Sequence, residues 1–334
     1  MCRVFPRRVA LCCAFLLPLS SLLLIGALPV AARTQLWTFT GPWDPASDAS
    51  LTRHAAAIDV AVTGWIALDS ATAEPVVPSL YRDDPRAAGA TAARFAIVTS
   101  WHGLSFHPAS VRTLASNPQR LARVARRIAA SAQQAGYRGL VLDFENQEPR
   151  DLPRLLAVVM AITDSAHAHG LKQVAIAVPA ADTAAYPTRA LLGVTDFVLP
   201  MLYDEHWDSS PPGAISDPAW VRTTLAARIA GVDRARIVAG LGTYAYHWPR
   251  GKPGEQLSYD DARRGVERAG AKLTRDTATQ TLRAIAPNGD QYWVTDAELL
   301  HRLVGVVRSL GVERVSLWRL GQEDPAIWRD GVLR

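Results

Sequence analysis

The stretch GLVLDFE, residues 139–145, has the pattern of a buried β-strand that ends in two carboxylates. Side chains of a strand point alternately to opposite faces, so Val141, Asp143 and Glu145 share one face, while the opposite face is apolar throughout. Two strand rises place the Cα atoms of the two acidic residues about 6.7 Å apart. Because burying an unpaired carboxylate is costly, we expect the pair to face an open mouth. A pair that is only solvated at a rim and bound by backbone N–H groups is the alternative.

Seven further apolar, β-branched or aromatic stretches alternate with helical stretches along the chain. Continuous apolar runs of this kind are typical of parallel strands that helices cover. Eight such units in roughly 300 residues predict an α/β fold, a (β/α)8 TIM barrel, rather than a doubly wound sheet. The expected strands are 36–40, 58–65, 94–100, 139–145, 172–179, 196–203, 236–244 and 314–320.

Start signals mark the helices between these strands. Asn117 and Asp217 each precede a proline, as expected for an N-cap followed by the first helical residue. Asp151 is expected to open another helix, and residues 298–310 form the last helix before strand eight. The order of strands and helices therefore fits one barrel.

One stretch, from about residue 248 to 295, interrupts the alternation. Proline- and glycine-rich turns surround a short expected helix, 258–269, and two alternating segments, 279–285 and 291–294. We therefore predict a small α+β insertion between strands seven and eight, which walls one side of the barrel mouth.

The first 32 residues have the features of a signal peptide. Three arginines precede an apolar run over residues 9–28, and the small residues at 30–32 match a cleavage site that ends at Ala32. A retained membrane anchor is the alternative, because the run approaches the ~20 residues that a bilayer span needs. We expect cleavage, no stable membrane insertion afterwards, and a secreted or periplasmic barrel domain over residues 33–334.

Charge and cysteine content narrow the classes of function. The chain carries 36 basic and 31 acidic residues, a formal charge of +5, and three of the basic residues lie in the N-terminal segment. The remaining +2 gives no support to nucleic-acid binding, and the arginines of residues 120–127 have the spacing of a solvated helix face. All three cysteines lie in the N-terminal segment, so the barrel has no disulfide framework. No zinc motif is present, and we expect a monomer without metal or cofactor.

A second polar cluster, MLYDEHW at residues 201–207, follows expected strand six. Tyr203 lies at the strand end, where a phenol two strands away from the carboxylate pair can reach the same cavity. Asp204, Glu205 and His206 begin the next loop and are candidates for contact with a substrate.

Aromatic side chains occur at several other expected strand ends. Tyr244, Trp318 and Trp43 are candidate substrate contacts, and Trp37 and Trp65 lie near the first two strand ends. Aromatic rings at such positions suit stacking against the faces of sugars. Taken singly, each tryptophan can equally belong to the core.

Together these residues resemble glycoside hydrolase family 18, the chitinase-like barrels. The strand-four signature of that family is D-x-x-D-x-D-x-E, and its strand-six signature is M-x-Y-D. The runs DFE at 143–145, YDEHW…PPG at 203–213 and LWRLG…EDP at 317–325 are most similar to bacterial branches that include spore-cortex-lytic enzymes and modules fused to polysaccharide synthases. The resemblance extends from Trp37 to the C-terminus in the family's order.

The resemblance implies a retaining, substrate-assisted hydrolysis of N-acetylglucosamine-containing glycans. Glu145 matches the general acid that protonates the glycosidic oxygen and later activates water, and Asp143 matches the carboxylate that holds the acetamido group. Tyr203 matches the hydroxyl that supports the cyclic intermediate, and Asp204 matches the neighbouring rim carboxylate. Trp318 matches the aromatic floor beneath the reacting sugar.

The sequence also departs from the family pattern. Arg138 and Val141 stand where the first two aspartates of the signature usually lie, and Gly242 and Ala245 replace the usual proline and glycine near strand seven. Without a carboxylate at position 141, we expect Asp143 to ionise more readily.

Our leading hypothesis is an exported glycoside hydrolase that cleaves a β-linked N-acetylglucosamine polymer, such as peptidoglycan, chitin or an exopolysaccharide. The absent aspartates also allow a catalytically silent carbohydrate-binding barrel of the cell envelope. A scaffolding role in envelope assembly and another kind of barrel hydrolase are the remaining hypotheses.

Overall fold

The computed structural model describes residues 1–2, 34–77, 92–329 and 331–333. The chain divides into two compact units, Met1–Ala32 and Arg33–Arg334. The expected signal peptide falls almost wholly outside the described residues, so the fold below is that of the second unit. Within the described ranges, no helix combines the length and the apolar character that crossing a bilayer requires.

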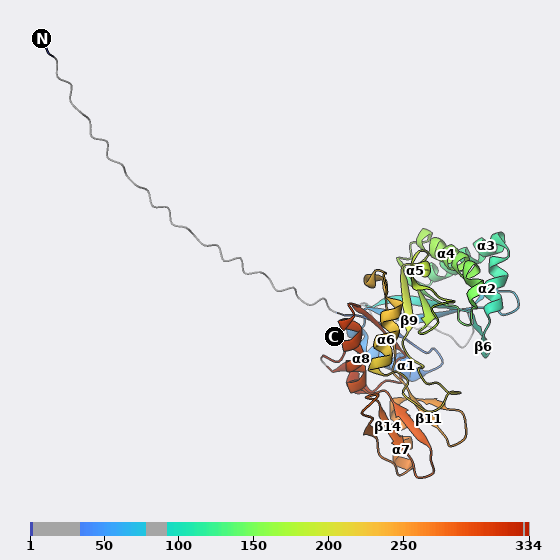
Figure 1. Ribbon diagram of the computed structural model, residues 1–334. Coiled ribbons are helices and arrows are strands. Elements are labelled where there is room, and N and C mark those ends of the chain that lie inside the picture. Colours follow the sequence, from blue (N-terminus) through green and yellow to red (C-terminus); the bar gives the residue numbers. More distant parts are fainter. Residues whose placement is uncertain (3–33, 78–91, 330, 334) are drawn as a thin grey trace. The chain divides into compact units, whose positions relative to one another are not determined.

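In the described part of the second unit, eight parallel strands form a closed barrel, which confirms the predicted (β/α)8 fold (Figure 1). β1 pairs with both β2 and β16, and this double pairing closes the sheet. The barrel strands are β1 (Gln35–Phe39), β2 (Val60–Leu68), β4 (Ala93–Thr99), β7 (Gly139–Asp143), β8 (Gln173–Pro179), β9 (Phe197–Met201), β10 (Ala239–Gly242) and β16 (Arg314–Trp318). All eight overlap the stretches expected from the sequence, with ends that differ by a few residues.

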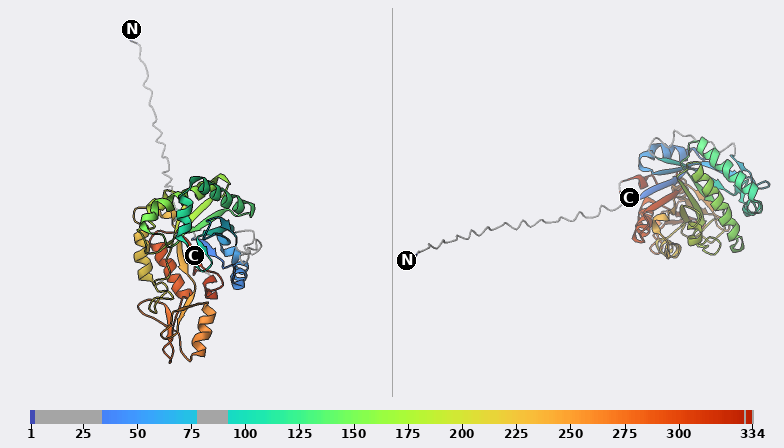
Figure 2. Two further views of the ribbon diagram at one scale, coloured as in Figure 1. Left: turned by 90° about the vertical axis from the view of Figure 1, so that its right-hand side faces the viewer. Right: turned by 90° about the horizontal axis from the view of Figure 1, so that it is seen from above.

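Helices cover the outside of the barrel, and α2, α3 and α4 pack against one another on one side of it (Figures 1 and 2). The expected caps at Asn117 and Asp217 are present, since their Oδ1 atoms accept from the amides of Arg120 at 2.9 Å and Trp220 at 2.7 Å. The helices are α1 (Pro45–His54), α2 (Pro108–Ala115), α3 (Pro118–Gln134), α4 (Leu152–Ala168), α5 (Thr188–Leu192), α6 (Pro218–Arg228), α7 (Tyr259–Arg268) and α8 (Ala297–Ser309).

Asp151 directly precedes α4, as expected, although its side chain makes no capping hydrogen bond. Its carboxylate instead bonds the guanidinium groups of Arg112 at 3.1 Å and Arg154 at 2.9 Å. The start of α4 follows a 3-10 turn, Pro149–Asp151, which leaves the Asp151 side chain directed at these two cations.

Strand β7 alternates as predicted. Val141 belongs to the apolar interior of the barrel, whereas Leu140, Leu142 and Phe144 belong to the layer between sheet and helices. The interior combines aliphatic side chains with five aromatic ones, and Trp37 lies there fully buried, in edge contact with Phe95 at 5.1 Å between ring centroids. Trp37 is therefore a core residue and not part of an open cavity.

The insertion between β10 and α8 forms a five-stranded antiparallel sheet with α7 packed on it. It projects from the barrel in Figure 1, where β11, β14 and α7 are labelled, and in the left view of Figure 2. Its first strand begins at Ala245, three residues earlier than the sequence predicts. The strands are β11 (Ala245–Trp248), β12 (Glu255–Leu257), β13 (Thr274–Arg275), β14 (Leu282–Ile285) and β15 (Gln291–Val294).

Two short antiparallel strand pairs lie at the ends of the barrel strands. β3 (Pro75–Val76) pairs antiparallel with the end of β2. β5 (Trp101–His102) and β6 (Ser105–Phe106) pair directly after β4, and they carry Trp101 and Phe106 to the same end of the barrel as the carboxylate pair.

Candidate active site

A cavity of about 720 Å³ opens at the carboxyl ends of the barrel strands. Seven barrel strands contribute lining residues from their ends: Phe39, Trp65, Ile97, Asp143, Ala177, Pro179, Leu199, Met201 and Trp318. Loops that follow the strands add polar groups, and β12 of the insertion adds Gln256. The insertion therefore contributes to the wall of the cavity at the face where barrel enzymes carry their chemistry.

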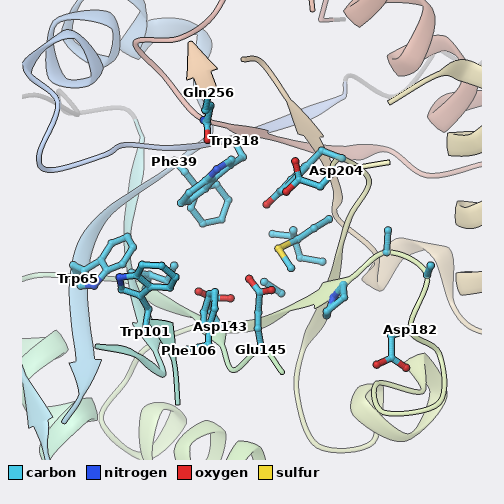
Figure 3. Close-up of a pocket in the computed structure, with 18 of the residues that line it drawn as sticks. Phe39, Trp65, Trp101, Phe106, Asp143, Glu145, Asp182, Asp204, Gln256 and Trp318 are labelled. Atoms are coloured by element: carbon cyan, nitrogen blue, oxygen red, sulfur yellow. The ribbon is translucent and has the colours of Figure 1, made fainter. Parts of the chain in front are cut away.

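Asp143 and Glu145 lie side by side and point into this cavity (Figure 3). Strand β7 ends at Asp143, two residues earlier than predicted, because the backbone turns after Glu145 with Asn146 in the left-handed region at φ 59°. The shared face persists beyond the last strand residue, so the alternation of 139–145 still brings the two carboxyl groups together.

Burial raises the pKa of both carboxyl groups. Oδ2 of Asp143 accepts from Oγ1 of Thr99 at 3.0 Å. The interaction between the two side chains lowers the pKa of Asp143 and raises that of Glu145. Burial raises the pKa of Glu145 well above its usual range, and the charges of Asp143 and Asp204 raise it further. Glu145 is therefore the group of the pair that carries the proton near neutral pH.

The pKa of Asp143 is raised even though position 141 carries no carboxylate. Val141 removes a neighbouring charge, but Asp143 is only 7% exposed, and burial raises the pKa of its carboxyl above the usual range. Thr99 and Glu145 lower it in part. Arg138, the other departure from the family pattern, lies exposed before the amino end of β7, remote from the cavity.

Tyr203 and Asp204 follow β9 and line the same cavity, with Asp204 across it from the carboxyl groups of Asp143 and Glu145 (Figure 3). Burial and the charges of Glu145 and Asp204 raise the pKa of Tyr203, which therefore remains a hydrogen-bond donor. Asp204 adopts a positive φ of 57° and receives a hydrogen bond from the hydroxyl of Tyr244. It is open to the water of the cavity, but surrounding protein atoms still raise its pKa.

Aromatic rings form the apolar walls. Trp318 packs edge-on against Phe39 with 5.5 Å between ring centroids, above the two carboxyl groups in Figure 3. Trp43 packs edge-on against Trp65 at 5.3 Å on another flank, and Trp43 is 47% exposed. Of the predicted contacts, Glu145, Asp143, Tyr203, Asp204, Trp318 and Trp43 thus line one cavity.

Tyr244, Glu205 and His206, which the sequence also suggests as contacts, do not line the cavity. Tyr244 is buried behind Asp204 and reaches the cavity only through that carboxylate. Glu205 turns away because its Oε2 accepts from the amide of Asp217 at 3.0 Å, at the start of α6. Nδ1 of His206 bonds the carbonyl of Pro211 at 2.9 Å, which holds the ring inside its own loop.

Several lining residues were not predicted from the sequence. Trp101 and Phe106 reach the cavity from the hairpin after β4, and Asp182 and Trp220 reach it from the segments after β8 and β9. Trp101 follows an expected strand end and so carries the same signal as Trp43. Gln256 carries no local signal, because its place depends on how the insertion folds back on the barrel.

Comparison with known proteins agrees with this geometry. The sequence profile of glycosyl hydrolases family 18 matches residues 100–323. The cortical fragment-lytic enzyme of Bacillus subtilis (strain 168) is 24% identical over 248 residues, which cover 70% of this chain and 58% of the relative. A putative sporulation-specific glycosylase, YdhD, of the same organism is 24% identical over 67% of this chain and 57% of the relative. The chain thus spans less than three fifths of the length of these curated relatives.

Solved structures show the same fold. A class V chitinase from Pseudomonas fluorescens Pf-5 superposes with a TM-score of 0.80 at 22% identity, over 90% of this chain and 98% of the other. The spore cortex-lytic enzyme SleL of Bacillus megaterium QM B1551 superposes with a TM-score of 0.78 at 17% identity, over 89% of this chain and 72% of the other. With the family profile matching about two thirds of its length, the chain belongs to glycosyl hydrolases family 18.

Proposed function

We propose that this chain hydrolyses a β-linked glycan that contains N-acetylglucosamine, with retention of configuration and with assistance from the substrate's acetamido group. One observation carries the proposal: the carboxyl groups of Asp143 and Glu145 lie side by side in a cavity whose walls are aromatic. An acid with a raised pKa beside an ionised partner is the arrangement that glycosidic bond cleavage needs near neutral pH.

The first step follows from these groups. Glu145 gives its proton to the glycosidic oxygen, and the bond between that oxygen and the anomeric carbon breaks. The acetamido carbonyl oxygen supplies the electron pair for a new bond to the anomeric carbon. Asp143 accepts a hydrogen bond from the acetamido N–H, which stabilises the positive charge of the cyclic intermediate. The hydroxyl of Tyr203 supports the same group.

The second step regenerates the enzyme. The Glu145 carboxylate accepts a proton from water, and the water oxygen attacks the anomeric carbon from the face that the leaving group occupied. The bond to the acetamido oxygen breaks, and its electron pair returns to the amide. Two inversions at one carbon give a product of retained configuration.

The apolar walls suit a sugar polymer. Trp318 and Phe39 lie above the carboxyl groups, and Trp43 and Trp65 form a further aromatic surface that can stack on neighbouring sugar faces. Relatives described as chitinases and as cortical fragment-lytic enzymes support a glycan of this kind. Peptidoglycan, chitin and an exopolysaccharide of N-acetylglucosamine are the substrates to test.

Export is part of the proposal, with residues 1–32 as a cleaved signal peptide and residues 33–334 as a monomeric domain outside the cytoplasm. The intact mass of the protein recovered from the periplasm or medium tests it, because cleavage after Ala32 leaves Arg33 as the first residue. Light scattering of the purified domain tests the monomer. A full-length mass in the membrane fraction would contradict export by cleavage.

The test of function is hydrolysis of the three glycans by wild type and by Glu145→Gln. We expect reducing ends from at least one glycan and a loss of activity of at least about 10³-fold in the variant. Glu298→Gln is the matched control, since Glu298 lies on α8 outside the cavity. A Glu145→Gln variant as active as wild type would refute the assignment. Glycan affinity without product from either protein would instead identify a carbohydrate-binding barrel, the reading that the absent aspartates at 138 and 141 favour.

A further inference from the structure

The backbone on both sides of Glu145 is bound to one buried hydroxyl group. Tyr186 lies after β8 and is 1% exposed. Its hydroxyl donates to the carbonyl oxygen of Phe144 at 2.8 Å and accepts from the amide of Gln147 at 2.9 Å. These two groups belong to the residue before Glu145 and to the second residue after it, so a single oxygen atom spans the turn that carries the acid.

Among the residues that the structure describes, no strand pairs with this turn. The ladder between β7 and β8 ends at the pair of Asp143 with Ala177, and Asn146 follows in the left-handed region. The side chain of Gln147 donates to the carbonyl of Glu145 at 3.2 Å. Phe144 and Gln147 are buried, so their backbone groups need hydrogen-bond partners within the protein. The Tyr186 hydroxyl supplies one for the carbonyl of Phe144 and one for the amide of Gln147.

Tyr186 is itself fixed from behind by Arg228, a fully buried residue at the end of α6. The guanidinium donates to the carbonyl of Tyr186 at 2.5 Å, to that of Ala180 at 2.8 Å and to that of Asp182 at 2.8 Å, and it also bonds the carbonyl of Pro179. The segment that follows β8 is thus held at both ends by one side chain.

We propose that Tyr186 is a positioning residue for Glu145, and that its hydroxyl holds the turn 144–147 so that the acid faces Asp143 and Tyr203. The proposal rests on the proposed function, since it takes Glu145 as the acid. Tyr186 does not line the cavity and touches no reacting atom. A displacement of about 1 Å in a reacting group is enough to lower turnover by about 10²-fold, so a turn with no strand pairing needs such support.

The test is Tyr186→Phe, which keeps the ring and removes the hydroxyl. We expect kcat to fall about 10–100-fold and KM to change by less than about twofold, because the aromatic walls are intact. The control is Tyr292→Phe, which removes the hydroxyl of another buried tyrosine, in the insertion and outside the cavity wall. We expect the control to retain the wild-type kcat.

A second measurement reads the position of Glu145 without turnover. The Glu145 carboxyl is titrated by NMR in protein labelled with ¹³C-glutamate, and its signal is assigned by its absence in Glu145→Gln. The titratable groups that face it are Asp143, Tyr203, Asp204 and Tyr186. We expect the pKa of Glu145 to move down toward its usual range in Tyr186→Phe, because a loosened turn admits water and weakens the effect of burial.

The outcomes separate the two proposals. A Tyr186→Phe protein with wild-type kcat and wild-type Glu145 titration overturns the positioning role, even if its melting temperature is lower. A wild type that cleaves no glycan refutes the proposed function, while the titration still decides the role of Tyr186. Should Tyr186→Phe fail to fold, Arg228→Lys is the second variant, because it weakens the hydrogen bonds that hold the segment carrying Tyr186. An unchanged kcat and titration in that variant would overturn the proposal equally.

Discussion

Replacing Thr99 by valine removes the hydroxyl group that donates to Asp143. Thr99 is fully buried at the end of β4, and its Oγ1 lies 3.0 Å from Oδ2 of Asp143. The bond favours the ionised carboxylate and so lowers the pKa of Asp143, against the larger and opposite effect of burial. Valine keeps nearly the same shape without the donor.

The expected shift in the pKa of Asp143 follows from the fact that the acceptor of this hydrogen bond is charged. A hydrogen bond to an ionised group contributes about 1.5–3 kcal/mol, which corresponds to about one to two pKa units. Loss of the bond raises the pKa of Asp143 further, so the acid limb of kcat/KM moves to higher pH by that amount. At pH values below the acid limb, kcat/KM of the variant is expected to be about 10–100-fold lower than that of wild type. The two become equal once the pH exceeds the shifted limb.

The assay is kcat/KM against pH on the best glycan substrate, with Thr99→Ser as the matched control. Serine keeps the hydroxyl and is expected to keep the wild-type limb. Oγ1 of Thr99 also accepts from the amide of Trp101 at 3.0 Å, and loss of that bond is expected to change KM equally at every pH. A Thr99→Val profile whose acid limb coincides with that of wild type would refute the role of this bond in setting the ionisation of Asp143.

Three further variants test two cavity residues and one carboxyl group beside the cavity. Asp143→Asn is expected to lower kcat about 10²–10³-fold. It is also expected to raise the stability to denaturant at neutral pH, because ionising a buried carboxyl with a raised pKa costs stability as the pH rises. A variant less stable than wild type would contradict this. Trp318→Ala is expected to raise KM at least about threefold through lost stacking, and an unchanged KM would show that sugars do not bind there. Burial and the charge of Asp217 raise the pKa of Glu205 to about 7, above its usual 4.5. Stability is therefore lost as the pH rises from 4.5 to 7, and Glu205→Gln should flatten this dependence in denaturant titrations, whereas an unchanged slope would argue against the burial of this carboxyl.

The barrel and the carboxylate pair were accessible from the sequence because both depend on strand periodicity. Alternation from Gly139 to Glu145 is fixed by which side chains must be apolar, and it survives even though the strand itself ends at Asp143. Tyr203 and Trp318 follow from the same rule, since the ends of barrel strands meet at one rim.

The side-chain directions of loop residues could not be predicted from the sequence in this way. Glu205 and His206 lie beside Tyr203 in sequence, but local bonds to Asp217 and Pro211 turn both away from the cavity. The period of a strand does not extend into a loop, where backbone partners far along the chain decide the direction of a side chain.

Contacts between segments far apart in the sequence could not be predicted from it either. Tyr186 bonds backbone groups about forty positions earlier in the chain, with separations of 42 residues to Phe144 and 39 to Gln147. Nothing in the residues around position 186 indicates that partner. Pairings of this kind are determined by the closed sheet, which places the ends of β7 and β8 side by side.

The anomeric configuration of the first product tests the proposed mechanism most directly. Proton NMR during early hydrolysis of a defined β-linked N-acetylglucosamine oligomer resolves the two anomers before they equilibrate. We expect the β-anomer from wild type and no product from Glu145→Gln. Initial release of the α-anomer would contradict substrate-assisted retention at the Asp143–Glu145 pair.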